Sequence, residues 1–183
     1  EGDLVILFAG KLELKKDPGF MLRLAERLPD PRLKLILVGN GKLENELKKQ
    51  AFNDKRIICL EFQNQEKMPV LYRLGDIFVL PSRGPGETWG LAVNEAMACN
   101  RPVIVSSKCG CAPDLVEEGR TGWIFEPGDA GDRKIGDLLG KILDDRSVLY
   151  GMGDHAWKKM ESFSYPVVVE SMRQLLGKIG LAK

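Results

Sequence analysis

The stretch IFVLPSRGPGETWGLAVNEAMACNRPVIVSS, residues 77–107, decides the fold that we expect. It opens and closes with short apolar, β-branched runs at residues 77–81 and 102–107, which are typical of buried strands. The Gly-Pro-Gly cluster at residues 84–86 indicates a loop, and the apolar segment 90–99 after it indicates a helix. A strand, a loop, a helix and a second strand in this order predict a βαβ unit of a parallel sheet.

The same alternation continues on both sides of this unit. Further strand candidates, several of them apolar on both faces, lie at residues 4–10, 33–39, 56–62 and 122–127. Helix patterns lie between and after them, at residues 18–29, 42–52, 66–75, 112–118, 130–144, 147–160 and 165–178. We therefore predict an α/β fold in one domain over residues 1–183. It is a doubly wound parallel sheet of about six strands, with helices on both faces and a helical C-terminal segment.

The charge and the apolar content exclude several classes of protein. Lys and Arg number 27 and Asp and Glu 26, so the net charge of +1 gives no case for a nucleic-acid partner. The chain shows neither a signal peptide nor an apolar run of the ~20 residues that span a bilayer. Cys59 and Cys99 lie in apolar segments and are interpreted as buried thiols of a reducing compartment. We therefore expect a cytoplasmic protein.

The residues that bind metals are too scattered in the sequence to predict a metal site. Cys109 and Cys111 form a C-x-C pair, but the only histidine, His155, lies in an unrelated helical segment. The chain also lacks a D-x-D motif that could hold a metal ion against a diphosphate. We expect neither a metal nor another cofactor.

Ligands of a doubly wound sheet bind beyond the carboxyl ends of the strands, so the residues that follow each strand are the candidate site. GNGKLE, residues 39–44, follows a strand and opens a helix, but Glu44 replaces the third glycine of the dinucleotide fingerprint. A Walker motif is also absent from the sequence. A tight strand-to-helix turn accounts for these glycines, and an NAD-linked domain or P-loop chemistry is disfavoured.

Three lysines follow the first predicted strand, in the segment GKLELKKDPG at residues 10–19. Taken alone, Lys11, Lys15 and Lys16 favour a solvated run of charge. The alternative is a cation site, because binding a diphosphate without a metal needs fixed positive charges and a helix N-terminus. Lys11 and Lys16 could supply those charges.

The segment GETWGLAVNEAMA, residues 86–98, carries two acids, Glu87 and Glu95. Glu87 is placed in the loop, since the helix is expected to begin near Trp89 or Gly90, and Glu95 falls in its second turn. That helix is apolar almost all round and is expected to be buried. A buried carboxylate needs hydrogen-bond donors, and sugar hydroxyls would be suitable. Gly90 would let a ligand approach the first N–H groups of the helix. The alternative is that Glu95 reaches solvent and Glu87 is an ordinary loop acid.

These segments together resemble a known family. A VLPS strand end, then GETWGLAVNEAMACNRPVIVSS, then CGCAPDLVEEGRTGWIFEPGD, is similar to the nucleotide-sugar-binding half of the retaining glycosyltransferases of family four, also called group 1. FAGKLELKK, LILVGNGKLENEL and LYRLGDIFVLPS extend the resemblance to about residues 4–129. The family has the GT-B fold, in which two Rossmann-like domains face each other across a cleft. Its signature is a pair of glutamates eight positions apart, which Glu87 and Glu95 fit.

The resemblance implies a role for each matched residue. Glu95 would bind the ribose hydroxyls, and Glu87 would contact the donor sugar near its reacting carbon. The backbone N–H groups of Gly90 and Leu91 would hold the diphosphate. The implied catalytic set is Glu87, Lys11 and Lys16, and the implied donor-binding set is Gly10, Phe62, Gln63, Trp89, Gly90, Leu91 and Glu95.

Some positions depart from the family pattern. Lys11 stands where an arginine is usual, which keeps the charge but loses the bidentate fork, and both Lys11 and Lys16 should pair with the diphosphate. Phe62 and Gln63 fall in the loop that usually contacts the base, and Glu61 stands there where a glycine is common. Base recognition is therefore left open.

The implied function is that of the donor-binding half of a glycosyltransferase. Such an enzyme moves a sugar, of the hexosyl type, from a nucleoside-diphosphate sugar to an acceptor hydroxyl with retention and without a metal. The acceptor would be a saccharide or a lipid-linked sugar, bound by an N-terminal domain that could bring the enzyme to the cytoplasmic face of a membrane. The alternative, from another class, is a catalytically inactive nucleotide-sugar-binding or scaffolding module.

The chain is also expected to be a fragment. It begins with EGDLVILF, directly in a predicted strand and without an initiating Met. We expect it to lack the N-terminal acceptor domain, to fold on its own and to transfer no sugar. In the family the last helix, at residues 165–178, would cross back toward that domain, and here it would either dangle or repack.

Overall fold

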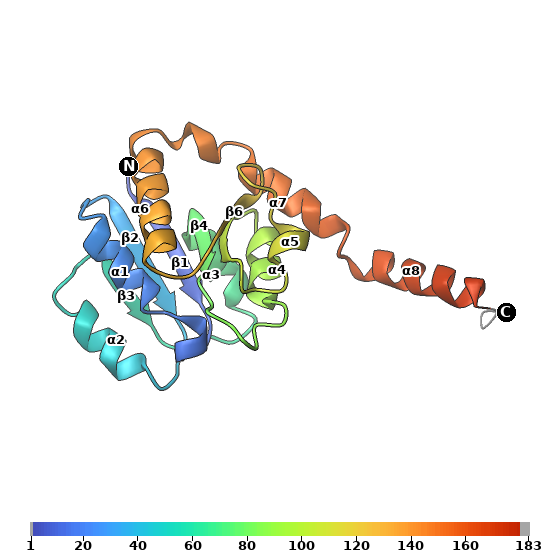
Figure 1. Ribbon diagram of the computed structural model, residues 1–183, viewed down its shortest axis with the longest axis horizontal. Helices are drawn as coiled ribbons and strands as arrows, with labels where there is room; N and C mark the ends of the chain where they lie inside the picture. Colours follow the sequence, from blue (N-terminus) through green and yellow to red (C-terminus); the bar gives the residue numbers. More distant parts are fainter. Residues whose placement is uncertain (1, 180–183) are drawn as a thin grey trace.

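Six parallel strands form one sheet in the computed structural model, which describes residues 2–179 (Figure 1). In chain order they are β1 (Leu4–Ala9), β2 (Leu33–Val38), β3 (Ile57–Leu60), β4 (Ile77–Leu80), β5 (Val103–Ser106) and β6 (Gly122–Phe125). Their spatial order is β3-β2-β1-β4-β5-β6, and all neighbours are parallel. The predicted doubly wound sheet is confirmed, with its switch in winding direction between β1 and β4.

Eight helices connect the strands and extend the chain beyond them in the described part. They are α1 (Phe20–Arg27), α2 (Glu44–Ala51), α3 (Met68–Leu74), α4 (Leu91–Ala98), α5 (Ala112–Leu115), α6 (Asp129–Asp144), α7 (Met152–Glu161) and α8 (Tyr165–Lys178). Two short 3₁₀ segments, η1 (Leu14–Lys16) and η2 (Arg146–Leu149), were not predicted. The single helix predicted at 147–160 is wrong, because Gly151, at φ 76°, separates η2 from α7.

The sheet is covered on both faces because most of its strand residues are apolar on both sides. On one face, α1 and α6 pack against the strands, and the ring of Phe20 in α1 contacts that of Phe125 in β6, with centroids 5.2 Å apart and planes tilted by 34°. On the other face, α3, α4, α5 and α7 share a second core with residues such as Phe78 of β4 and Val93 of α4. Both layers are visible in Figure 1.

Helix α8 lies apart from this three-layer body. Every residue from Tyr165 to Ile179 is exposed, and Figure 1 shows α8 projecting away beyond α7. Apart from Val167, its exposed apolar side chains recur at the spacing of one helix face: Tyr165, Val168, Val169, Met172, Leu175, Leu176 and Ile179. We expected this segment either to dangle or to repack on the domain, and the structure shows it dangling. Over residues 2–179, no helix combines the length and the apolar character needed to cross a bilayer.

Candidate functional site

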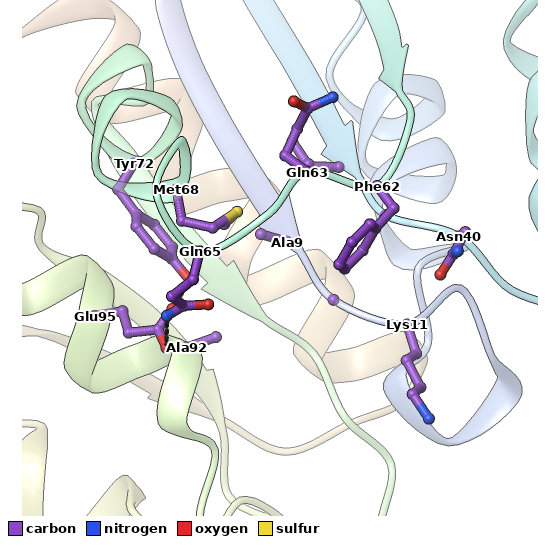
Figure 2. A pocket seen from close by; sticks show the side chains of 13 residues that line it. Ala9, Lys11, Asn40, Phe62, Gln63, Gln65, Met68, Tyr72, Ala92 and Glu95 are labelled. Carbon is purple, nitrogen blue, oxygen red and sulfur yellow. Dashed lines mark hydrogen bonds between the residues drawn. The ribbon is translucent and has the colours of Figure 1, made fainter.

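A cavity of about 270 Å³ lies at the carboxyl ends of the central strands (Figure 2). The loops after β1, β2 and β3 form one part of its wall, and helices α3 and α4 form the other. It is lined by Ala9, Gly10, Lys11, Val38, Gly39, Asn40, Phe62, Gln63, Gln65, Met68, Tyr72, Ala92 and Glu95. The cavity therefore occupies the position beside the switch in winding direction where this fold class binds ligands.

Two glycines bring the loops after β1 and β2 together at this cavity. Gly39, at φ 147°, lies so close to the carbonyl oxygen of Gly10 that a side chain at position 39 would collide with it. Gly41, at φ 155°, lies equally close to the backbone of Leu12, so a side chain at position 41 would collide with that backbone. The N–H of Leu12 donates to the carbonyl of Asn40 at 2.8 Å. These glycines thus serve the close approach of two backbones.

Glu95 lies at one end of the cavity and is held by two neutral donors. The hydroxyl of Tyr72 donates to Oε2 at 2.7 Å, and the amide of Gln65 donates to Oε1 at 2.9 Å (Figure 2). Glu95 is half-buried rather than buried, because α4 has only one fully buried face. Leu91 of α4 is 69% exposed, which corrects the expectation of a helix buried all round.

Lys11 and Phe62 lie in the remaining part of the cavity wall. Figure 2 shows Lys11 and Phe62 both toward the end of the cavity opposite Glu95. Phe62 is 63% exposed, so its side chain is accessible for stacking against an aromatic ligand. Gln63 lies beside it and donates to the carbonyl of Glu61 at 3.3 Å. The cavity thus combines a carboxylate, an aromatic face and a cation.

Glu87 lies outside this cavity and is held by charge. Its carboxylate forms an ion pair with Lys16, and the side chains are only 11% and 18% exposed. The hydroxyl of Ser82 donates to the same carboxylate oxygen at 3.1 Å. The backbone carbonyl of Glu87 accepts from the N–H of Gly110 at 3.0 Å. Two of the predicted catalytic residues therefore meet each other directly.

A charge network fixes the turn that carries Lys16. Asp17, at φ 47°, is buried and accepts from Arg23 at 2.8 Å and from Arg83 at 2.7 Å. Arg23 also donates to Asp132 of α6 at 2.6 Å. The backbone N–H of Arg83 donates to the carbonyl of Lys15 at 2.9 Å, so the loop after β4 is tied to the loop after β1. None of Asp17, Arg23, Ser82 and Arg83 was predicted from the sequence as a site residue.

Gly90 caps α4 in the left-handed region, at φ 109°. A side-chain carbon at position 90 would come within 2.9 Å of Leu80 and 3.3 Å of the Cys111 sulfur. Two features therefore require glycine at position 90: the close packing against Leu80 and Cys111, and the left-handed backbone conformation. The N–H of Val93 donates to the carbonyl of Gly90 at 2.8 Å, whereas the N–H groups of Leu91 and Ala92, as at any helix start, have no helical partner and can receive an anion.

Trp89, predicted to bind the donor, points its side chain elsewhere. Its indole N–H donates to Asn94 at 2.7 Å, and its ring lies against Phe163, with centroids 6.1 Å apart. Trp89 does not line the cavity. The structure therefore gathers Gly10, Lys11, Phe62, Gln63 and Glu95 in one cavity, pairs Lys16 with Glu87 outside it, and leaves Trp89 in a packing role.

The cysteines near this site are buried thiols. Cys109 donates to the carbonyl of Leu80 at 3.8 Å, and burial raises the pKa of Cys109 to about 11 and that of Cys111 to about 12. Cys59 is half-buried, which corrects the expectation that it is buried. Within residues 2–179 no three His, Cys, Asp or Glu side chains cluster closely enough to hold a metal ion.

The sequence matches a known family over most of its length. A model of the family described as "Glycosyl transferases group 1" matches residues 1–158. The chain is 32% identical over 183 residues to the D-inositol 3-phosphate glycosyltransferase of Corynebacterium jeikeium, covering 93% of this chain and 42% of that protein. The chain spans less than half the length of the first curated relatives that it matches.

Solved structures share the fold. The C-terminal domain of LpcC, a glycosyl transferase group 1 family protein of Francisella tularensis, superposes with a TM-score of 0.72 at 25% identity. The match covers 87% of this chain and 85% of that domain. Anabaena HepE in complex with UDP gives a TM-score of 0.83 at 21% identity, over 97% of this chain and 49% of HepE. The chain is thus similar in extent to one domain of such proteins.

Proposed function

Because the chain belongs to the group 1 glycosyl transferase family, we propose that it binds the nucleoside-diphosphate sugar of a glycosyltransferase. The single observation that carries the proposal is the cavity beside β1 and α4, with Glu95 and Lys11 at its two ends. A carboxylate accepts hydrogen bonds from the hydroxyls of a ribose, and a lysine pairs with a phosphate. HepE, which shares this fold, is known in complex with UDP and with UDP-glucose.

The nucleoside would lie along the cavity, and the diphosphate beside it. In this arrangement Glu95 holds the ribose, and the exposed ring of Phe62 stacks on the base with Gln63 near by. The diphosphate meets Lys11 and the first N–H groups of α4, beginning at Leu91, because anions are stabilised at a helix N-terminus. Gly10, in the cavity wall beside Lys11, lets the ligand approach the backbone.

The transferred sugar would lie near Glu87. Transfer with retention forms the bond from the acceptor oxygen to the anomeric carbon on the face from which the diphosphate leaves. The bond from that carbon to the phosphate oxygen breaks, and the acceptor proton passes to the departing phosphate. The negative charge that develops on the leaving group must be stabilised, and we assign this to Lys11, Lys16 and the N-terminus of α4 in place of a metal ion.

We further propose that these 183 residues bind the donor but transfer no sugar by themselves. The chain corresponds in extent to the isolated C-terminal domain of LpcC and to less than half of its curated relatives. The acceptor, a saccharide or a lipid-linked sugar, would be bound by another domain of the complete enzyme. All four cysteines are free thiols, which suits the cytoplasmic location that we propose.

Calorimetric titration of the chain with UDP, GDP and ADP tests the proposal. We expect one of the three to bind, and Glu95→Ala to weaken that binding at least tenfold, because the ribose hydroxyls lose a charged acceptor. Glu170→Ala is the matched control, since Glu170 of α8 also accepts from a glutamine amide, at 3.2 Å, but lies far from the cavity. Absence of binding by all three, or equal binding by the Glu95→Ala variant, would contradict the proposal.

A further inference from the structure

The two hydrogen bonds to Glu95 come from very different surroundings. Tyr72 lies in α3 and is 2% exposed, whereas Gln65 lies in the exposed loop between β3 and α3. We propose that Tyr72 positions Glu95 for the ribose, and that Gln65 occupies the place of a ribose hydroxyl and leaves when the nucleotide binds. This inference rests on the proposed function, since it needs Glu95 to be the ribose ligand.

Tyr72 has the surroundings of a fixed donor. Its ring meets that of Phe78 edge to face, with centroids 5.5 Å apart and planes at 74°. Phe78 belongs to β4 and is fully buried, so the Tyr72 ring cannot move without disturbing the sheet. The hydroxyl reaches Oε2 of Glu95 at 2.7 Å, the length of a strong bond to an ionised oxygen. Tyr72 therefore sets the orientation of the carboxylate before any ligand arrives.

The hydroxyl of Tyr72 also stays protonated. Burial and the hydrogen bond to Glu95 both raise the pKa of Tyr72 far above its usual value. The phenol is therefore a neutral donor over the whole physiological range, and Oε2 remains occupied by it. A ligand must use the other carboxylate oxygen, Oε1, or the lone pairs of Oε2 that the phenol leaves free.

Gln65 has the surroundings of a group that can leave. Its amide donates to Oε1 at 2.9 Å, but the side chain is exposed and lies in a loop. Figure 2 shows Gln65 and Tyr72 converging on Glu95, with Gln65 on the cavity wall. A ribose hydroxyl is also a neutral donor, so it can replace the amide with the same hydrogen-bond count. The release of a glutamine side chain restores its rotamer freedom.

The two residues should therefore affect binding in opposite directions. Loss of the Tyr72 hydroxyl frees the carboxylate to rotate, which weakens its bonds to the ribose. Loss of the Gln65 amide removes a competitor for Oε1, which strengthens binding. Neither effect should appear with a nucleotide that has no ribose hydroxyls to offer.

The experiment uses whichever of UDP, GDP and ADP binds to the chain. It measures the affinity of each variant for this nucleotide and for the 2′,3′-dideoxy form of the same nucleotide. For Tyr72→Phe we expect about a tenfold loss with the ribonucleotide and no change with the dideoxy form. For Gln65→Ala we expect about a twofold gain with the ribonucleotide alone. Tyr150→Phe and Gln174→Ala are matched controls, because Tyr150 is 81% exposed and Gln174 bonds to a glutamate on α8.

Each contrary outcome identifies what fails. Equal losses with both nucleotides would mean that Tyr72 only supports the cavity wall, and an unchanged affinity would remove it from the site. A loss of affinity in Gln65→Ala would make Gln65 a ligand contact instead of a placeholder. Glu95→Ala reports on the proposed function separately: if it loses affinity while Tyr72→Phe does not, only the present inference is overturned. If none of the three nucleotides binds, both are overturned.

Discussion

Glu95 accepts hydrogen bonds from two neutral groups, a phenol and an amide, whereas Glu87 is paired with the ammonium group of Lys16. The two acids stand eight positions apart in one continuous segment. A neutral donor can be exchanged for a sugar hydroxyl at little electrostatic cost. An ion pair can be exchanged only for another charge, so an anion that binds Lys16 has to compete with Glu87.

The difference comes from the elements that carry the two acids. Glu95 lies in the second turn of α4, where the neighbouring helix α3 presents Tyr72. Glu87 lies in the loop after β4, opposite the lysine-rich turn after β1. The two glutamates therefore have different partners, because the eight-residue spacing places one of them in a loop and the other in a helix. Substitutions at Lys16, Asp17, Glu87 and Glu95 test this contrast, beginning with the largest expected effect, and deletion of α8 is added as the change with the smallest.

Removal of the Lys16 ammonium should have the largest effect on diphosphate binding. In Lys16→Ala, the diphosphate loses a cation, and the mostly buried carboxylate of Glu87 is left unpaired beside it. We expect the affinity for the nucleoside diphosphate to fall by about 30-fold, measured by calorimetry. The neighbour Lys15, which is exposed, gives the matched control Lys15→Ala. Equal losses of affinity in both variants would mean that the lysines attract the diphosphate only through a general positive potential and not through a specific contact of Lys16.

Asp17→Asn should destabilise the part of the molecule around Glu87. Asp17 is buried between Arg23 and Arg83, so the neutral amide would weaken both ion pairs. We expect a loss of about 2 kcal/mol in the free energy of unfolding, from urea titrations, because Arg83 is half-exposed and part of the effect is screened. In the control Asp144→Asn, the side chain is 80% exposed and no change should be seen.

The same variant sharpens the comparison between the acids. Because Asp17 braces the turn of Lys16 and does not touch Glu95, the preference for the ribonucleotide over its dideoxy form should be unchanged in Asp17→Asn. A collapse of that preference would show that the two acids belong to one cooperative unit.

Loss of the negative charge at each acid should give effects of opposite sign. Glu87→Gln releases Lys16 to pair with the diphosphate, so the affinity for the nucleoside diphosphate should rise by about fivefold. Glu95→Gln keeps the size of the side chain but removes a charged acceptor, so the affinity should fall by about tenfold. Calorimetry measures the affinity of both variants for the nucleoside diphosphate. A lower affinity in both would contradict the expected difference between the two acids. With a nucleotide sugar as ligand, the gain in Glu87→Gln should disappear, because the sugar loses its contact.

The smallest effect is expected from deletion of α8. A chain that ends at Ser164 loses a helix in which no described side chain is buried, so the free energy of unfolding should change by less than about 0.5 kcal/mol. The truncated chain should also bind the nucleotide as the full chain does. Light scattering checks a second consequence. Because the deletion removes the exposed apolar side chains of α8, it should reduce the concentration-dependent association of the chain with itself. A large loss of stability would show that α8 contributes to the body.

The sequence predicted the sheet and most of the helices because their signals are local. Buried strands show as apolar runs, and helices as apolar periodicity, within a few residues. The split at Gly151 was missed although the signal was present, since the Tyr-Gly-Met-Gly segment at 150–153 contains the glycine of a turn.

The partners of the site residues could not be predicted in the same way. Tyr72 is 23 positions from Glu95, and Arg83 is 66 positions from Asp17, so neither contact follows from local spacing. The lysine-rich turn had the pattern of a solvated run because the partners of its charges lie elsewhere in the sequence: Glu87 and Arg83 in the loop after β4, and Arg23 in α1. Trp89 was included in the donor-binding set that the resemblance implied, but a match of positions does not give the direction of a side chain, and the ring packs on Phe163.

The close backbone approach at Gly39 limits how this cavity can diversify. With the carbonyl of Gly10 in contact, position 39 has no room for any side chain larger than hydrogen, and its left-handed backbone excludes most replacements as well. That part of the wall is therefore invariant in shape. If the cavity holds the nucleoside, differences in base preference are expected in the neighbouring exposed loop after β3, which carries Phe62 and Gln63. A library restricted to that loop is the economical route to a change in nucleotide preference.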